Sequence, residues 1–181
     1  MPLNQIKVYN QFLELPHLNE PQRAASLRAI FNRDIESNDT LAFRTKKIRP
    51  IKNADGQPAL DVLFDHLTKA AIEIKDSDGK IIKKRSDWDD GRCLRLHWVK
   101  HHIEERKADG FVVFSYIDRI KGRGDVPRTY LYDQAEQYVV VLEPYTVTAD
   151  YYLITAFHLT KDKGGTKQIA QKLAQKLDAV L

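Results

Sequence analysis

Hydrophobic residues in the first half of the chain recur with α-helical spacing at two places. The spacing predicts a helix over residues 20–36, with Pro21 in its first turn and apolar side chains at Ala24, Leu27, Ile30, Phe31 and Ile35. It predicts a second helix over residues 59–72, with apolar side chains at Leu60, Leu63, Phe64 and Leu67. Residues 41–51 are predicted to be extended. Residues 72–85 are predicted to form a hairpin with Asp78–Gly79 as its turn.

The second half of the chain has a different pattern, because β-branched and aromatic residues become frequent. Residues 110–120, 128–133, 137–144 and 151–160 are predicted to be consecutive strands, joined antiparallel by short links. After Gly164 and Gly165, Thr166 caps a final helix whose apolar stripe is Ile169, Leu173, Leu177 and Val180. We therefore expect an α+β fold, with N-terminal helices packed on an antiparallel sheet of about four strands and a C-terminal helix.

Length and composition fit one domain of ordinary solubility, with 181 residues, 43% hydrophobic and 30% charged. We assign residues 1–90 to a helical and extended region that belongs to the domain, and residues 91–181 to its core. No apolar run reaches the length of a membrane span, and the N-terminus lacks the pattern of a secretory signal. The single cysteine, Cys93, excludes an intramolecular disulfide and a cysteine-based zinc site, and a reducing cytoplasm is the natural setting.

Basic residues gather in three stretches of the chain, which has a net charge of +4. Residues 44–52 hold five basic and no acidic side chains, residues 80–85 hold four basic ones, and residues 118–128 hold four basic and two acidic ones. Any one stretch alone reads as a solvated surface. The three together favour a phosphate-rich ligand such as RNA.

Three of the six histidines, His97, His101 and His102, lie within residues 95–106. On a helix, His102 falls within the apolar arc, whereas His97 and His101 share the opposite face. Three explanations stand side by side: a metal site on His97 and His101, structural roles, and metal-free acid–base chemistry. Because two histidines alone do not complete a metal site, we expect neither a metal nor another cofactor.

The predicted strands carry matching polar side chains. Arg128 and Tyr130 share one face of their strand, and Arg128 can clamp a phosphate. Thr155 brings a hydroxyl into the apolar run "YYLITAFHL", although threonine also packs well in strands. A histidine-bearing helix over such a sheet suits metal-free RNA cleavage, which needs a base, a cation and an acid. We therefore expect one imidazole and Arg128 to meet across a groove floored by Thr155.

The motifs "FDHLT", "RLHWVKHHI", "RTYLYD", "YVVVLEP" and "YYLITAFHL", in this order, resemble the phage-associated branch of the barnase/EndoU/colicin/RelE-like nuclease group. The resemblance covers residues 25–180. It implies a metal-independent ribonuclease of a toxin or phage, acting in the cytoplasm of a bacterial host, with tRNA among its substrates. An immunity or antitoxin protein, or a phage structural protein, is the implied protein partner.

Carried over residue by residue, the resemblance implies catalytic roles for Arg128, Thr155 and either His97 or His102, with Tyr130 as an addition and His101 kept open. The candidates for binding the RNA backbone are Lys100, Arg119, Lys121 and Arg123. Two alternatives remain: a non-catalytic RNA-binding or phage structural module on the same fold, and a metal-dependent enzyme using His97 and His101.

Overall fold

The computed structural model of the chain describes residues 3–52, 58–75, 81–107, 109–160 and 165–181. Its helices are η1 (Leu3–Ile6), α1 (Glu20–Phe31), η2 (Asn32–Glu36), α2 (Leu60–Thr68), α3 (Asp90–Cys93), α4 (Trp98–Ile103) and α5 (Gly165–Ala174). Its strands are β1 (Ala42–Phe43), β2 (Lys46–Pro50), β3 (Lys69–Lys75), β4 (Ile81–Trp88), β5 (Phe111–Ile120), β6 (Gly124–Asp133), β7 (Tyr138–Tyr145) and β8 (Asp150–His158). Within these residues, no helix has the length and apolar character needed to cross a membrane.

The four strands predicted in the second half form consecutive antiparallel pairs, β5–β6, β6–β7 and β7–β8, which confirms an α+β fold. The sheet is nevertheless larger than predicted, with six strands in the order β1-β2-β8-β7-β6-β5. The basic stretch at 46–50 supplies β2, which pairs in parallel with β8. An antiparallel sheet of four strands was therefore an incomplete prediction, because this pairing joins segments about a hundred residues apart.

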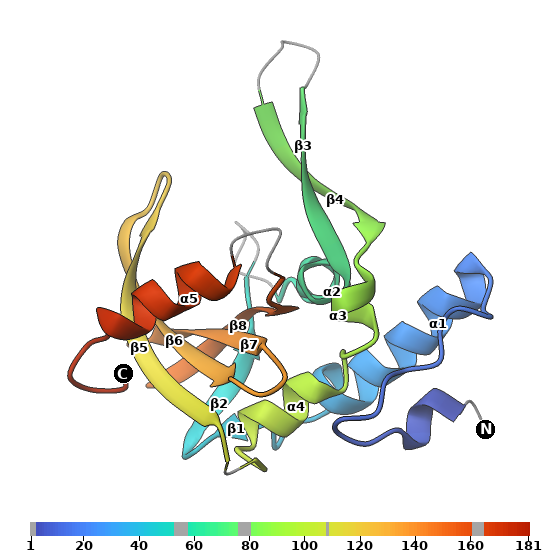
Figure 1. Cartoon of the computed structure of the whole chain (residues 1–181), viewed down its shortest axis with the longest axis horizontal. Helices are drawn as coiled ribbons and strands as arrows, with labels where there is room; N and C mark the ends of the chain where they lie inside the picture. Colours follow the sequence, from blue (N-terminus) through green and yellow to red (C-terminus); the bar gives the residue numbers. More distant parts are fainter. Residues whose placement is uncertain (1–2, 53–57, 76–80, 108, 161–164) are drawn as a thin grey trace.

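Each face of the sheet has its own core (Figure 1). Side chains of α1, α2 and α4 pack with alternate residues of the strands, such as Leu131 and Val140, on the first face. On the second face, α5 contributes Ile169, which packs with Tyr130 and Val141. Residues from both sides of position 90 thus share the first core.

Two predicted helices end earlier than the sequence suggested. The helix over 59–72 stops at Thr68, because Lys69–Lys75 pairs with β4 instead and forms the predicted hairpin. The Asp78–Gly79 turn lies outside the described residues. The C-terminal helix stops at Ala174, and the backbone N–H of Leu177 donates to the Ser115 carbonyl at 2.8 Å.

The predicted histidine helix is broken into two short helices. The Asp89 side chain caps α3 by accepting from the Arg92 backbone at 3.1 Å. The chain then turns before α4, and His97 is the N-cap residue of α4 rather than part of a continuous helix. The expectation that all three histidines lie on one continuous helix therefore misplaced His97.

Two two-stranded ribbons extend beyond the six-stranded sheet. The β3–β4 pair forms a sheet of its own. The β5–β6 hairpin continues to Ile120 and Gly124, whereas β6 pairs with β7 only over Thr129–Asp133. Both ribbons project to the same side of the molecule (Figure 1).

Candidate functional site

The three clustered histidines lie over the first face of the sheet and not beside Arg128. His102 is fully buried, and its ring centroid lies 5.2 Å from that of Tyr138, a member of the first core. Arg128 and Tyr130 point to the second face, where Tyr130 packs with Val141. The expected groove between an imidazole of residues 95–106 and Arg128 is therefore wrong, because the sheet stands between them.

The histidines instead hold the N-terminal segment against α4. His97 Nε2 lies 3.2 Å from the Val8 carbonyl oxygen, and the residue is only 5% exposed. The predicted placement of His97 on the helix face opposite the apolar arc, away from the core, is therefore wrong. His101 stacks on the Tyr9 ring at 4.1 Å. His102 lies inside the apolar arc, as predicted.

A buried carboxylate completes this arrangement. Asp133 Oδ2 accepts from His102 Nε2 at 3.0 Å and from the Tyr9 hydroxyl at 2.5 Å, while Oδ1 accepts from Lys107 at 2.6 Å. Burial alone would raise the pKa of Asp133. The donors from His102, Lys107, Tyr9 and the Glu136 backbone outweigh it, so the pKa lies well below its usual range. These contacts assign a structural role to the cluster.

The other three predicted catalytic residues do lie together. Arg128, Tyr130 and Thr155 line one pocket of about 190 Å³ on the second face, between the sheet and α5. Tyr130 and Thr155 are both register partners of Val141, on β6 and β8 respectively. Two strand spacings place their backbones about 10 Å apart. α5 adds Gln168 and Lys172 to the lining.

Charges in this pocket are paired. Arg128 lies 3.6 Å from Asp118 and 3.5 Å from Glu143, and Lys172 also pairs with Asp118. Lys172 donates to the Tyr130 hydroxyl at 2.6 Å, and that hydroxyl donates to Asp118. Burial, followed by the hydrogen bond to Asp118, raises the pKa of Tyr130, which therefore remains protonated. Lys172 and Asp118 make contacts in this pocket that the sequence patterns did not single out.

Thr155 connects this pocket to an imidazole from α2. β2 pairs with β8 only as far as Leu153, so α2 and α3 pack on the edge of β8 beyond that point. The Thr155 hydroxyl donates to the His66 carbonyl at 3.0 Å and accepts from Arg92 at 2.8 Å. Arg92 also donates to the carbonyls of His66 and Ala156, at 2.5 and 2.7 Å.

The geometry of His66 fixes its tautomer. Nδ1 lies 3.1 Å from the Ile154 carbonyl oxygen, which can only accept, so Nδ1 carries the hydrogen and Nε2 keeps its lone pair. Burial lowers the pKa of His66, and the positive charges of Arg85 and Arg92 lower it further. His66 is therefore neutral near pH 7 and lines a second pocket, of about 480 Å³, with Lys84 and Arg85. The motif "FDHLT" contains it, but only the tertiary structure brings it to Thr155.

The predicted RNA-binding residues divide between three places. Lys100 lines a different pocket, beside His97 and His101. Arg119 and Lys121 are exposed on the β5–β6 ribbon, where Arg119 pairs with Asp125. Arg123 makes two hydrogen bonds to Glu143, at 3.1 and 2.6 Å, and Glu143 also pairs with Arg128.

The described residues bring together no group of three or more His, Cys, Asp or Glu side chains suited to hold a metal ion. His97 and His101 therefore have no third ligand among them. The comparisons with known proteins found no matching family model, no matching curated protein and no matching solved structure.

Proposed function

We propose that this protein is a metal-independent ribonuclease whose site is the second face of the sheet, with the His66 pocket beside it. The observation that carries the proposal is that Arg128, Tyr130 and Thr155 line one pocket, while the Thr155 hydroxyl binds the residue that bears a neutral imidazole. RNA, with tRNA among its forms, is the proposed substrate. The proposed setting is the cytoplasm of a bacterial host, with a neutralising protein as partner.

The chemistry assigns one role to each group. The lone pair of His66 Nε2 takes the proton from a ribose 2′-OH, and O2′ forms a bond to phosphorus. Arg128 stabilises the negative charge that develops on the phosphoryl oxygens. The P–O5′ bond breaks, and O5′ takes the hydroxyl proton that Tyr130 donates to Asp118 in the free protein, while the Lys172 ammonium stabilises the phenolate that remains. The products are a 2′,3′-cyclic phosphate and a free 5′-hydroxyl.

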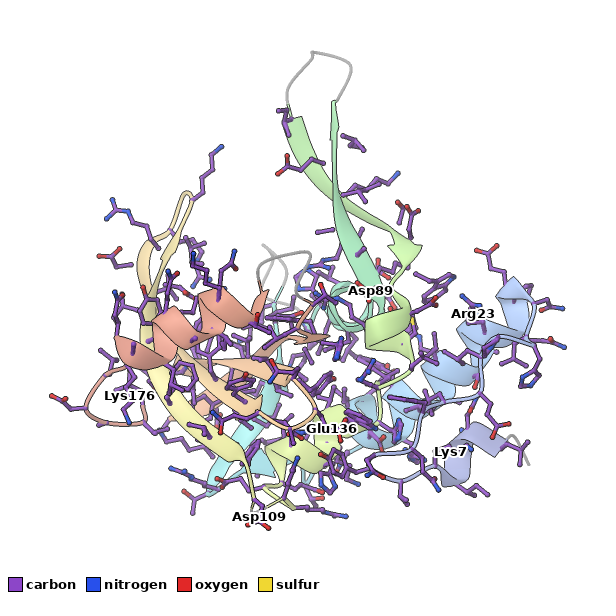
Figure 2. The ribbon with its side chains drawn as sticks, viewed as in Figure 1. Lys7, Arg23, Asp89, Asp109, Glu136 and Lys176 are labelled. Carbon is purple, nitrogen blue, oxygen red and sulfur yellow. The ribbon has the colours of Figure 1, made fainter. Side chains whose placement is uncertain are left out.

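Thr155 and Arg92 are positioning residues in this scheme. Their hydrogen bonds hold the His66 carbonyl at the edge of β8, which fixes α2 relative to the sheet. Arg92 is mostly enclosed, and its position follows from the cap that Asp89 places on α3. Figure 2 labels Asp89 where α3 begins, at the base of the β3–β4 ribbon.

One observation favours the alternative of a non-catalytic RNA-binding module. Asp118 and Glu143 already compensate the positive charges of Arg128, Arg123 and Lys172, so an incoming phosphate must compete with two carboxylates. A protein that bound RNA at its outer basic residues alone would not need to break these pairs. Binding that weakens steeply with salt, without any cleavage, would support this alternative.

The test is incubation of the protein with total RNA and with purified tRNA in EDTA. We expect discrete fragments that end in 2′,3′-cyclic phosphate. His66→Asn keeps a donor at the Nδ1 position for the Ile154 carbonyl but removes Nε2, and Arg128→Ala removes the cation. Each should lower the cleavage rate by about 10²-fold or more.

Arg106→Ala is the matched control, because Arg106 is an exposed arginine outside the three basic stretches and pairs with Glu104, beside α4. It should cleave RNA at the parent rate. Equal rates for the parent, His66→Asn and Arg128→Ala proteins, all folded by circular dichroism, would refute the proposed site.

A further inference from the structure

The two projecting ribbons stand at either side of the candidate site. Arg128 and Asp118, which line the Arg128 pocket, lie on the β5–β6 ribbon. Lys84 and Arg85, which line the His66 pocket, lie on β4. Figure 1 shows both ribbons extending to the same side of the molecule. Since a two-stranded ribbon gains little stability from its own packing, these extensions are better suited to contact a partner than to build the core.

Both ribbons carry excess positive charge. Residues 117–128 contain four basic and two acidic side chains, and strands β3 and β4 together contain five basic and two acidic ones. The Arg119 side chain is 86% exposed, and Lys121 and Lys84 are exposed as well. In Figure 2, nitrogen-tipped side chains extend into solvent from the end of the β5–β6 hairpin.

The described parts of the two ribbons offer unpaired bases few aromatic rings. Proteins that hold single strands stack the bases on aromatic rings. On the β5–β6 ribbon, Tyr116 is the register partner of Arg128, but it packs against the second core and Lys172 lies 5.4 Å from the centre of its ring. Strands β3 and β4 contain only Trp88, at the base of their ribbon. Trp88 packs edge-on against Phe64, and Lys69 covers its ring at 5.4 Å. The ribbons therefore present charge for phosphates and no surface for bases.

We propose that the two ribbons grip a base-paired RNA stem by its phosphates, so that folded RNA is the preferred ligand of this face. In a stem the bases are stacked inside and the phosphates line the outside, which matches two arms that carry charge alone. The inference rests on the proposed function, and it adds the class of RNA and the surface that selects it. Thr155 lines the Arg128 pocket and binds the His66 carbonyl, and His66 lines the other pocket, so a stem held by both ribbons would lie across the candidate site.

The experiment measures binding apart from cleavage. The His66→Asn protein is titrated in EDTA with a fluorescent RNA stem-loop and with an unstructured RNA of equal length, over a series of salt concentrations. We expect the stem-loop to bind about tenfold more tightly. Lys84→Ala and Lys121→Ala, each added to this background, should weaken stem-loop binding several-fold and make the salt dependence shallower by about one phosphate contact each.

Lys176→Ala is the matched control, since Lys176 is an exposed lysine outside the three basic stretches, and Figure 2 labels it near the C-terminal end of α5, away from the ends of the ribbons. The inference is overturned if unstructured RNA binds as tightly as the stem-loop, or if Lys84→Ala and Lys121→Ala affect binding no more than Lys176→Ala does. If the stem-loop is preferred and both lysine variants weaken its binding, but the parent protein never cleaves RNA, the role of the ribbons is supported and the ribonuclease proposal is refuted. If the parent protein cleaves RNA without preferring the stem-loop, the ribonuclease proposal is supported and the role of the ribbons is refuted.

Discussion

Asp133→Asn tests whether the histidine cluster is structural. Asp133 is fully buried and accepts four hydrogen bonds, from His102, Tyr9, Lys107 and the Glu136 backbone. Asparagine keeps the size of the side chain but loses its charge and replaces one acceptor oxygen with a donor amide. Two of the four donors then face an N–H group, whichever way the amide is oriented.

The expected cost follows from this geometry. Removing one partner of a buried charge pair costs about 3–5 kcal/mol, because the remaining charges stay buried without compensation. For a chain of this size, that loss lowers the melting temperature by about 6–20 °C. Urea unfolding followed by circular dichroism measures the free energy, and a thermal scan measures the midpoint.

A matched variant separates this effect from a general loss of charge. Asp125→Asn removes a carboxylate that is 63% exposed and pairs with Arg119 on the surface. It should change the free energy of unfolding by less than about 1 kcal/mol. A loss below about 1 kcal/mol for Asp133→Asn as well would refute the structural reading of the histidines.

The same variant has a signature in acid. The pKa of Asp133 is lower in the folded than in the unfolded protein. The stability that its carboxylate contributes is therefore present above the unfolded pKa of about 3.9 and is lost as the pH falls through the lower folded value. The parent protein should therefore lose stability below about pH 4 more steeply than Asp133→Asn does. If the two proteins lose stability equally steeply below about pH 4, the assignment of Asp133 as a buried, paired carboxylate is contradicted.

Three further outcomes follow from the structure. Burial lowers the pKa of His101 from 6.5 to about 4, so the contribution of its neutral form to folding stability is present above pH 6.5 and is lost as the pH falls toward 4. His101→Phe keeps the stack on Tyr9 and should make the free energy of unfolding in urea depend less on pH between 6.5 and 4. Burial raises the pKa of the fully enclosed Cys93 thiol to about 12, so a thiol reagent should label the protein only after denaturation. Arg92→Met removes three hydrogen bonds at the edge of β8, including the one to Thr155, and should cost about 3 kcal/mol in urea unfolding.

The sequence alone determined the strands of the second half and the faces of their side chains. Alternation along a strand is local, because successive side chains point to opposite faces. Arg128 and Tyr130 therefore had to share a face, and the structure brings Thr155 to the same pocket. The cap on α1 was equally local, since Asn19 and Gln22 exchange hydrogen bonds within one turn.

Only the tertiary structure decided what the helices cover. The histidine cluster lies on the first face because α4 packs there with Trp98, and His97 is buried because residues from the N-terminus cover it. The parallel pairing of β2 with β8 leaves an open edge beyond Leu153, and α2 fills it with His66. Helical periodicity shows which side of a helix is apolar, but not which face of a distant sheet receives it, because that choice depends on contacts between segments far apart in the chain.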